Sequence, residues 1–295
     1  MPLRRPLKSL IKLRYRGTQL AVFVVLTYAL AWSSWFSIST PFVQKGGIYF
    51  RILGSWHGIP GPDLFVLLGN LSPGIAALIT ITLASGKTGL ADLWRRSTAA
   101  HASFAPYAIA CLLPIAYSYF SLVILHILGT QAAHLDSPFR HFIDLALTLP
   151  FAPLFEEIGW RGYLLPKLEK TTGDFRSSVL VGLIWGPWHA PLLLMAPHPG
   201  MALLDVLIVF CILTIGLSIL FTWTFNWSRG LLLPVILLHG FHNAATSYFL
   251  SSTISAGGWM PLLILTVIVW LAATAVLIIG RMYKNGREEW RVAGP

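Results

Sequence analysis

The stretch LPFAPLFEEIGWRGYLLP, residues 149–166, sets two glutamates and an arginine inside an otherwise apolar run. Ionisable side chains inside a bilayer are disfavoured by roughly 2.5–3.5 kcal/mol each on insertion scales, and they usually mark a catalytic site or a transport path. Two further polar clusters stand in apolar runs, namely His189, and His239 with Asn243. The three clusters together predict a membrane-embedded protein with a polar site in its interior.

The composition supports a membrane protein. The chain has 56% hydrophobic and 11% charged residues and a mean hydropathy of +0.70, whereas a soluble domain carries roughly 25% charged residues. We therefore predict an all-α, polytopic transmembrane helix bundle that forms a single domain over residues 19–280. The net charge of +10 does not indicate nucleic acid, because the basic residues flank the apolar runs. The expected partner is the lipid bilayer, and the oligomeric state stays open.

About eight apolar runs approach the ~20 residues that a helix needs to cross a bilayer. They cover residues 19–40, 63–85, 104–128, 139–165, 177–196, 201–224, 231–250 and 259–280. With this count, every Lys and Arg except Lys45, Arg51 and Arg140 falls on one side of the membrane. The positive-inside rule then places the basic segment 1–18 and the tail 281–295 in the cytoplasm. The compact chain favours a prokaryotic plasma membrane.

Helical geometry predicts different roles for the two neighbouring glutamates. Glu157 and Arg161 are four residues apart with the glutamate first, which is the favourable order for an ion pair on a helix. Glu156 points to another face and has no such partner, so it is free to face the interior and to act in general acid and base chemistry. The alternative is that both glutamates only tie helices together by hydrogen bonds.

The histidine clusters allow a catalytic and a structural interpretation. Trp185 lies one turn before His189 and would cover one side of its imidazole. His239 and Asn243 share a helix face and could both donate hydrogen bonds to a developing oxyanion. Alternatively, Asn243 orients the His239 ring, or the pair is a polar clasp between helices. We expect His242, which points elsewhere, to pack between helices or to support the site residues from behind.

Depth along the predicted spans distinguishes these interpretations. Glu156, His189 and His239 lie on three different spans, at depths of roughly 12–18 Å from the cytoplasmic ends at 1.5 Å per residue. Composition alone does not require that three helices bring their polar residues to one level. The convergence favours a catalytic or metal site that faces the cytoplasm.

The three motifs, in this order, resemble those of the CPBP intramembrane protease family, also called the Abi or type II CAAX prenyl endopeptidase family. They are Glu156-Glu157-x-x-x-Arg161, an aromatic-x-x-x-His at Trp185 to His189, and His-x-x-x-Asn at His239 to Asn243, within a core at about 139–250. The resemblance implies that Glu156 and His189 activate water, that His239 and Asn243 stabilise the oxyanion, and that Glu157 and Arg161 support the site. Trp185 departs from the family's more usual phenylalanine.

The function that follows is an integral membrane endopeptidase without a cofactor. Its expected partners are protein or peptide substrates at the membrane, including C-terminal segments of the prenylated CAAX type. A zinc-dependent version would use Glu156, His189 and His239 as three ligands with an open fourth position. A rival from another class is a proton-coupled transporter or a non-catalytic membrane scaffold, because intramembrane Glu and His residues also form proton relays.

Overall fold

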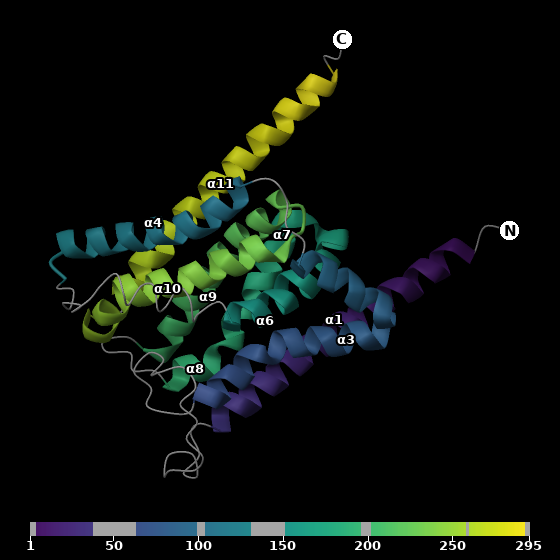
Figure 1. Cartoon of the computed structure of the whole chain (residues 1–295), viewed down its shortest axis with the longest axis horizontal. Helices are drawn as coiled ribbons and strands as arrows, with labels where there is room; N and C mark the ends of the chain where they lie inside the picture. Colours follow the sequence, from purple (N-terminus) through teal and green to yellow (C-terminus); the bar gives the residue numbers. More distant parts are fainter. Residues whose placement is uncertain are drawn as a thin grey trace.

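The computed structural model describes residues 4–37, 63–98, 104–130, 151–195, 202–257 and 260–292, and every regular element within these ranges is a helix (Figure 1). In chain order these are α1 (Arg4–Ser37), α3 (Asp63–Thr98), α4 (Ala105–Ile127), α6 (Phe151–Gly159), the π-helix η1 (Trp160–Leu164), α7 (Leu165–Trp188), α8 (Ala190–Met195), α9 (Leu203–Trp227), α10 (Leu232–Gly257) and α11 (Met260–Val292). The prediction of an all-α polytopic bundle is confirmed.

Six helical segments of the described chain are long and apolar enough to cross a membrane, against about eight predicted. They are Gly17–Ser37, Phe65–Thr98, Ala105–Ile127, Ala152–Met195, Leu203–Trp227 and Met260–Gly280. The run predicted at 231–250 corresponds to α10, in which His239, His242 and Asn243 lower the hydropathy. Residues 139–150 of the predicted fourth run lie outside the described residues.

The long segment Ala152–Met195 contains a break that the sequence places between two spans. Gly173 has φ 74° and ψ 170°, a conformation that L-residues with a side chain rarely adopt. The helix changes direction there, between the predicted spans 139–165 and 177–196. The segment Ala152–Met195 therefore comprises parts of two predicted spans, which are joined by a kink at Gly173.

The helices pack in pairs around the polar residues. α3 lies between α1 and α6, α7 packs on α9, and α4 packs on α10. Small residues allow these backbones to approach closely, as is typical of membrane helix interfaces. A Cβ added to Gly159 would lie 2.6 Å from the carbonyl carbon of Pro73, and one added to Gly182 would lie 2.6 Å from the Cα of Ile215. These contacts fix α6 against α3 and α7 against α9.

We expect Gly159→Ala to destabilise the protein, because the new methyl group would overlap the Pro73 backbone, which cannot move as a side chain can. Overpacking of this kind costs about 1–3 kcal/mol. The matched control is Gly280→Ala, whose added Cβ has no atom within 4 Å. Thermal unfolding in detergent measures both variants, and equal unfolding midpoints would contradict the close α3–α6 packing.

Candidate active site

A fully buried carboxylate joins three of the elements around the predicted site. Glu157 Oε1 on α6 accepts a hydrogen bond from Arg161 Nη1 at 3.1 Å and lies 2.8 Å from His239 Nδ1 on α10. Arg161 Nη2, on η1, also donates to Ser218 Oγ on α9 at 3.1 Å. Because a carboxylate only accepts hydrogen bonds, Nδ1 of His239 carries the hydrogen. The Glu157–Arg161 pair forms as its spacing predicts, whereas the contact between Glu157 and His239 was missed.

The π-helix η1 follows directly after the glutamates and carries Arg161. Its five residues, Trp160–Leu164, are all buried, and the Arg161 side chain has no exposed surface. The guanidinium lies 5.3 Å from the centre of the Trp185 ring and 4.8 Å from that of Phe221. Short π-helical insertions often occur at functional sites. Here the insertion places a buried cation between two aromatic faces and the carboxylate.

Trp185 on α7 connects the predicted site residues to one another. Its indole Nε1 donates to Glu156 Oε2 at 2.9 Å, and its carbonyl oxygen lies 3.0 Å from His189 Nδ1. Its ring also lies 5.2 Å from the His239 ring in an edge-to-face arrangement. Sequence reasoning treated Trp185 only as a wall beside His189. The need of a buried indole N–H for an acceptor was the signal that could have indicated its bond to Glu156.

The irregular end of α7 explains how His189 reaches the Trp185 carbonyl. In a continuous α-helix the His189 backbone N–H would donate to Trp185, but here it donates to the Gly186 carbonyl at 3.1 Å. The Trp185 carbonyl is thereby left for the imidazole. A carbonyl only accepts, so Nδ1 of His189 carries the hydrogen and Nε2 of the neutral ring has a lone pair. The bond to the Trp185 carbonyl, which the local backbone leaves available, therefore sets the tautomer of His189.

Asn243 lies one turn after His239 on α10 and is half-buried. No described residue forms a hydrogen bond with its side-chain amide. The alternative that Asn243 orients the His239 ring stays a prediction, and Glu157 holds Nδ1 of that ring. The neighbouring His242 points elsewhere, and its Nδ1 lies 2.7 Å from the hydroxyl of Tyr117 on α4. It packs between helices as expected.

The zinc alternative stays a prediction, and its three residues are not grouped as metal ligands in this arrangement. Within the described parts of the chain, no three His, Cys, Asp or Glu side chains are grouped so that they could hold a metal ion. Glu156 and His239 each use one polar atom, on Trp185 and on Glu157 respectively. A zinc site built from Glu156, His189 and His239 would require these side chains to rearrange.

Comparison with known proteins finds a similarity over the part of the chain that contains this site. Residues 138–245 match the family model described as type II CAAX prenyl endopeptidase Rce1-like. The chain is similar to this family over these residues, which make up less than half of its length. CAAX prenyl protease 2 of Methanococcus maripaludis is 40% identical over 52 residues, which cover 18% of this chain and 19% of that protein. The match thus spans about a fifth of the relative. Every predicted site residue, from Glu156 to Asn243, lies within the matched residues 138–245.

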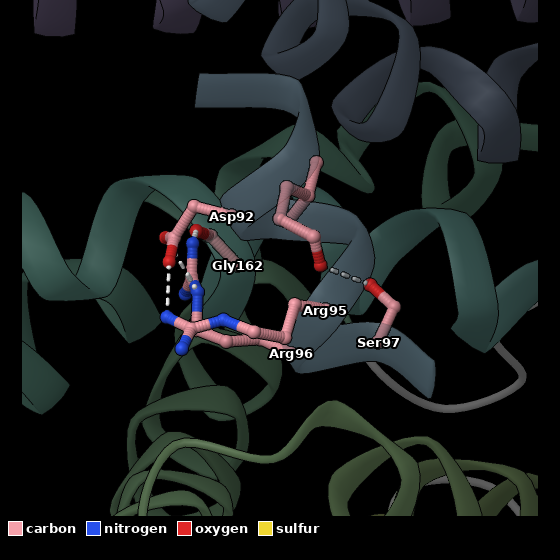
Figure 2. A network of polar contacts seen from close by, with 6 residues as sticks. Asp92, Arg95, Arg96, Ser97 and Gly162 are labelled. Atoms are coloured by element: carbon pink, nitrogen blue, oxygen red, sulfur yellow. Dashed lines mark hydrogen bonds and ion pairs between the residues drawn. The ribbon is translucent and has the colours of Figure 1, made fainter. Parts of the chain in front are cut away.

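A charge cluster on α3 lies outside the matched residues 138–245 and contacts them at Gly162 (Figure 2). Arg96 Nη2 donates to the Gly162 carbonyl of η1 at 3.0 Å, and Arg96 Nε donates to Asp92 at 3.1 Å. Arg95 also donates to Asp92, at 2.8 Å, but its side chain is 77% exposed. Arg96 is therefore the member of the cluster that connects α3 to the turn carrying Arg161.

We expect Arg96→Ala to destabilise the protein more than the neighbouring Arg95→Ala. The charged hydrogen bond to a partly buried carbonyl contributes about 1–2 kcal/mol after allowance for its exposure, whereas an exposed ion pair contributes about 0–1 kcal/mol. Thermal unfolding in detergent at low and high salt compares the two variants. If both lowered the midpoint equally, the contact with Gly162 would contribute nothing.

Replacement of the central carboxylate tests the buried network. Glu157→Gln keeps the hydrogen-bond acceptor but leaves the Arg161 charge without its partner, which typically costs about 3–5 kcal/mol for a buried pair. The double variant Glu157→Gln/Arg161→Gln removes both charges and should recover most of this loss. Unfolding midpoints of the two proteins make the comparison, and a single variant as stable as the wild type would rule out the charge pairing.

Proposed function

We propose that this protein is an integral membrane endopeptidase that hydrolyses peptide bonds near the cytoplasmic membrane face. The observation that carries the proposal is the attachment of both Glu156 and His189 to one residue, Trp185, within the residues that match the family model. A carboxylate and an imidazole that are both bonded to one tryptophan in an apolar bundle suit the activation of water. The convergence of the polar residues favours hydrolysis over a proton path across the membrane.

In the proposed mechanism Glu156 and His189 prepare the attacking water. Glu156 uses Oε2 to accept the Trp185 hydrogen bond, which leaves Oε1 as the oxygen that takes the water proton. His189 is fixed through Nδ1, and its Nε2 lone pair orients the same water. The water oxygen adds to the scissile carbonyl carbon, and Glu156 later returns the proton to the leaving amine nitrogen.

His239 and Asn243 would stabilise the oxyanion that this attack creates. Asn243 can donate from its neutral amide at any protonation state of the site. His239 uses its Nδ1 hydrogen on Glu157, so it can donate from Nε2 only as an imidazolium cation. Glu157 then supplies the opposite charge. This division gives the two neighbouring glutamates different roles, with Glu156 at the reacting water and Glu157 behind His239.

The substrates that we propose are membrane-associated or C-terminal protein segments. The name of the matched relative, CAAX prenyl protease 2, supports C-termini of the prenylated CAAX type. We place the protein in a prokaryotic plasma membrane with both termini in the cytoplasm, on the distribution of Lys and Arg in the sequence. The bilayer and the peptide are its proposed partners, and no cofactor is required by the leading mechanism.

We expect Glu156→Gln to abolish hydrolysis while the protein stays folded. Glutamine can still accept the Trp185 hydrogen bond, but it cannot take a proton from water, so kcat should fall by roughly 10²–10⁴-fold. The measurement uses purified protein in detergent with quenched peptides that carry prenylated and unprenylated C-termini. The matched control is Glu169→Gln, because Glu169 accepts a hydrogen bond from Asn226 away from the site.

The same assay addresses the zinc version of the mechanism. Cleavage that persists in a strong chelator supports the metal-free reaction, whereas cleavage that is lost in chelator and restored by Zn²⁺ supports the rearranged three-ligand site. Unchanged hydrolysis by Glu156→Gln would refute the role of Glu156 in either version.

A further inference from the structure

Three aromatic residues on one face of α1 contact the end of α7 that carries His189. Tyr28, Trp32 and Trp35 are spaced by four and three residues, so they share a helix face. We call them the α1 aromatic face. All three lie outside residues 138–245, the range of the family match. Their contacts with the site are therefore a property of this chain that the family match does not cover.

Two of these side chains bind backbone carbonyls of α7. The Tyr28 hydroxyl donates to the Ile184 carbonyl at 2.5 Å, and Trp32 Nε1 donates to the Trp188 carbonyl at 3.0 Å. In an unbroken helix the Leu192 N–H would bind the Trp188 carbonyl, but it donates to the His189 carbonyl instead. Trp32 thus binds a carbonyl that the helix break leaves open, directly before His189.

The third residue contacts the imidazole itself. Trp35 has no exposed surface, and its ring lies 6.3 Å from the His189 ring with an interplanar angle of 22°. Its Nε1 donates to the Val66 carbonyl on α3 at 3.2 Å, which holds the indole from the side of a different helix. Trp188 and Phe210 meet the same imidazole edge-to-face, at 4.6 Å and 5.1 Å. The plane of the His189 ring is therefore restricted from three sides.

We propose that the α1 aromatic face is a positioning element of the active site. Tyr28 and Trp32 hold the turn that carries His189, and Trp35 sets the plane of its ring, so that Nε2 is directed at the reacting water. The kinetic part of this inference rests on the proposed function. A displacement of about 1 Å in a reacting group can cost roughly 100-fold in rate, so α1 contributes to catalysis without touching the substrate.

Two variants test the positioning role, and a third serves as a matched control. Trp32→Phe removes the hydrogen bond to the Trp188 carbonyl, and Tyr28→Phe removes only a hydroxyl, so at least one variant should fold. The control is Ser34→Ala, which removes a hydrogen bond of the same kind from α1 to the Phe65 carbonyl of α3, at 2.8 Å. We expect kcat to fall by about 10-fold or more in both test variants, with KM unchanged. Ser34→Ala should leave kcat unchanged.

A second readout does not depend on activity. Protein labelled with ¹³C and ¹⁵N in histidine gives an imidazole signal for His189, assigned by its loss in His189→Gln. We expect the His189 signal to shift in Trp32→Phe and in Tyr28→Phe but not in Ser34→Ala. This readout separates the two proposals, because it reports the ring's surroundings even if no tested peptide is cleaved.

Each combination of results decides the inference. A shifted His189 signal with a reduced kcat and unchanged KM supports it. An unshifted signal in both folded variants overturns it whatever the activity, and so does a shifted signal with unchanged kcat. If the wild type cleaves nothing while the signal shifts, the endopeptidase proposal fails, and the contact between α1 and His189 stands as structural.

Discussion

The buried charge of Glu157 is the constraint on which the rest of the site depends. A carboxylate without exposed surface is tolerated only when cations and donors compensate for its lost hydration. Arg161 and His239 do so from η1 and α10, and Ser218 holds the far side of the guanidinium. Four elements must therefore meet at one point. Within the described chain Glu157 Oε2 and Arg161 Nε still make no hydrogen bond, so the network is not one that stability alone would favour.

Trp185 fixes the orientation of the side chains around this charged network. Its N–H fixes one oxygen of Glu156, its carbonyl fixes one nitrogen of His189, and its ring faces both Arg161 and His239. A phenylalanine at this position would keep the aromatic wall and the backbone carbonyl but lose the indole donor. The chain thus holds Glu156 by a bond that requires a tryptophan at this position.

The features of the fold and the site that depend on periodicity and hydropathy could be predicted from the sequence. The all-α bundle followed from composition, the Glu157–Arg161 pair from a spacing of four residues, and the break at Gly173 from the loop expected between two apolar runs. The bond between Glu157 and His239 joins residues 82 positions apart and depends on how α6 packs on α10. No local pattern encodes that packing. The role of α1 was missed for the same reason, because Trp32 and Trp35 look like ordinary lipid-facing aromatic residues until α7 lies beside them.

The irregular end of α7 leaves backbone carbonyls that accept hydrogen bonds from side chains. Inside a bilayer an open backbone carbonyl must find a donor from the protein, since no lipid chain can provide one. The break around His189 leaves two backbone carbonyls without a helical hydrogen bond. The Trp185 carbonyl accepts a hydrogen bond from the His189 ring, and the Trp188 carbonyl accepts one from the Trp32 indole. The first bond sets the tautomer of the imidazole and the second holds the turn that carries it. The same backbone defect that disfavours a straight span is therefore what gives His189 a fixed orientation.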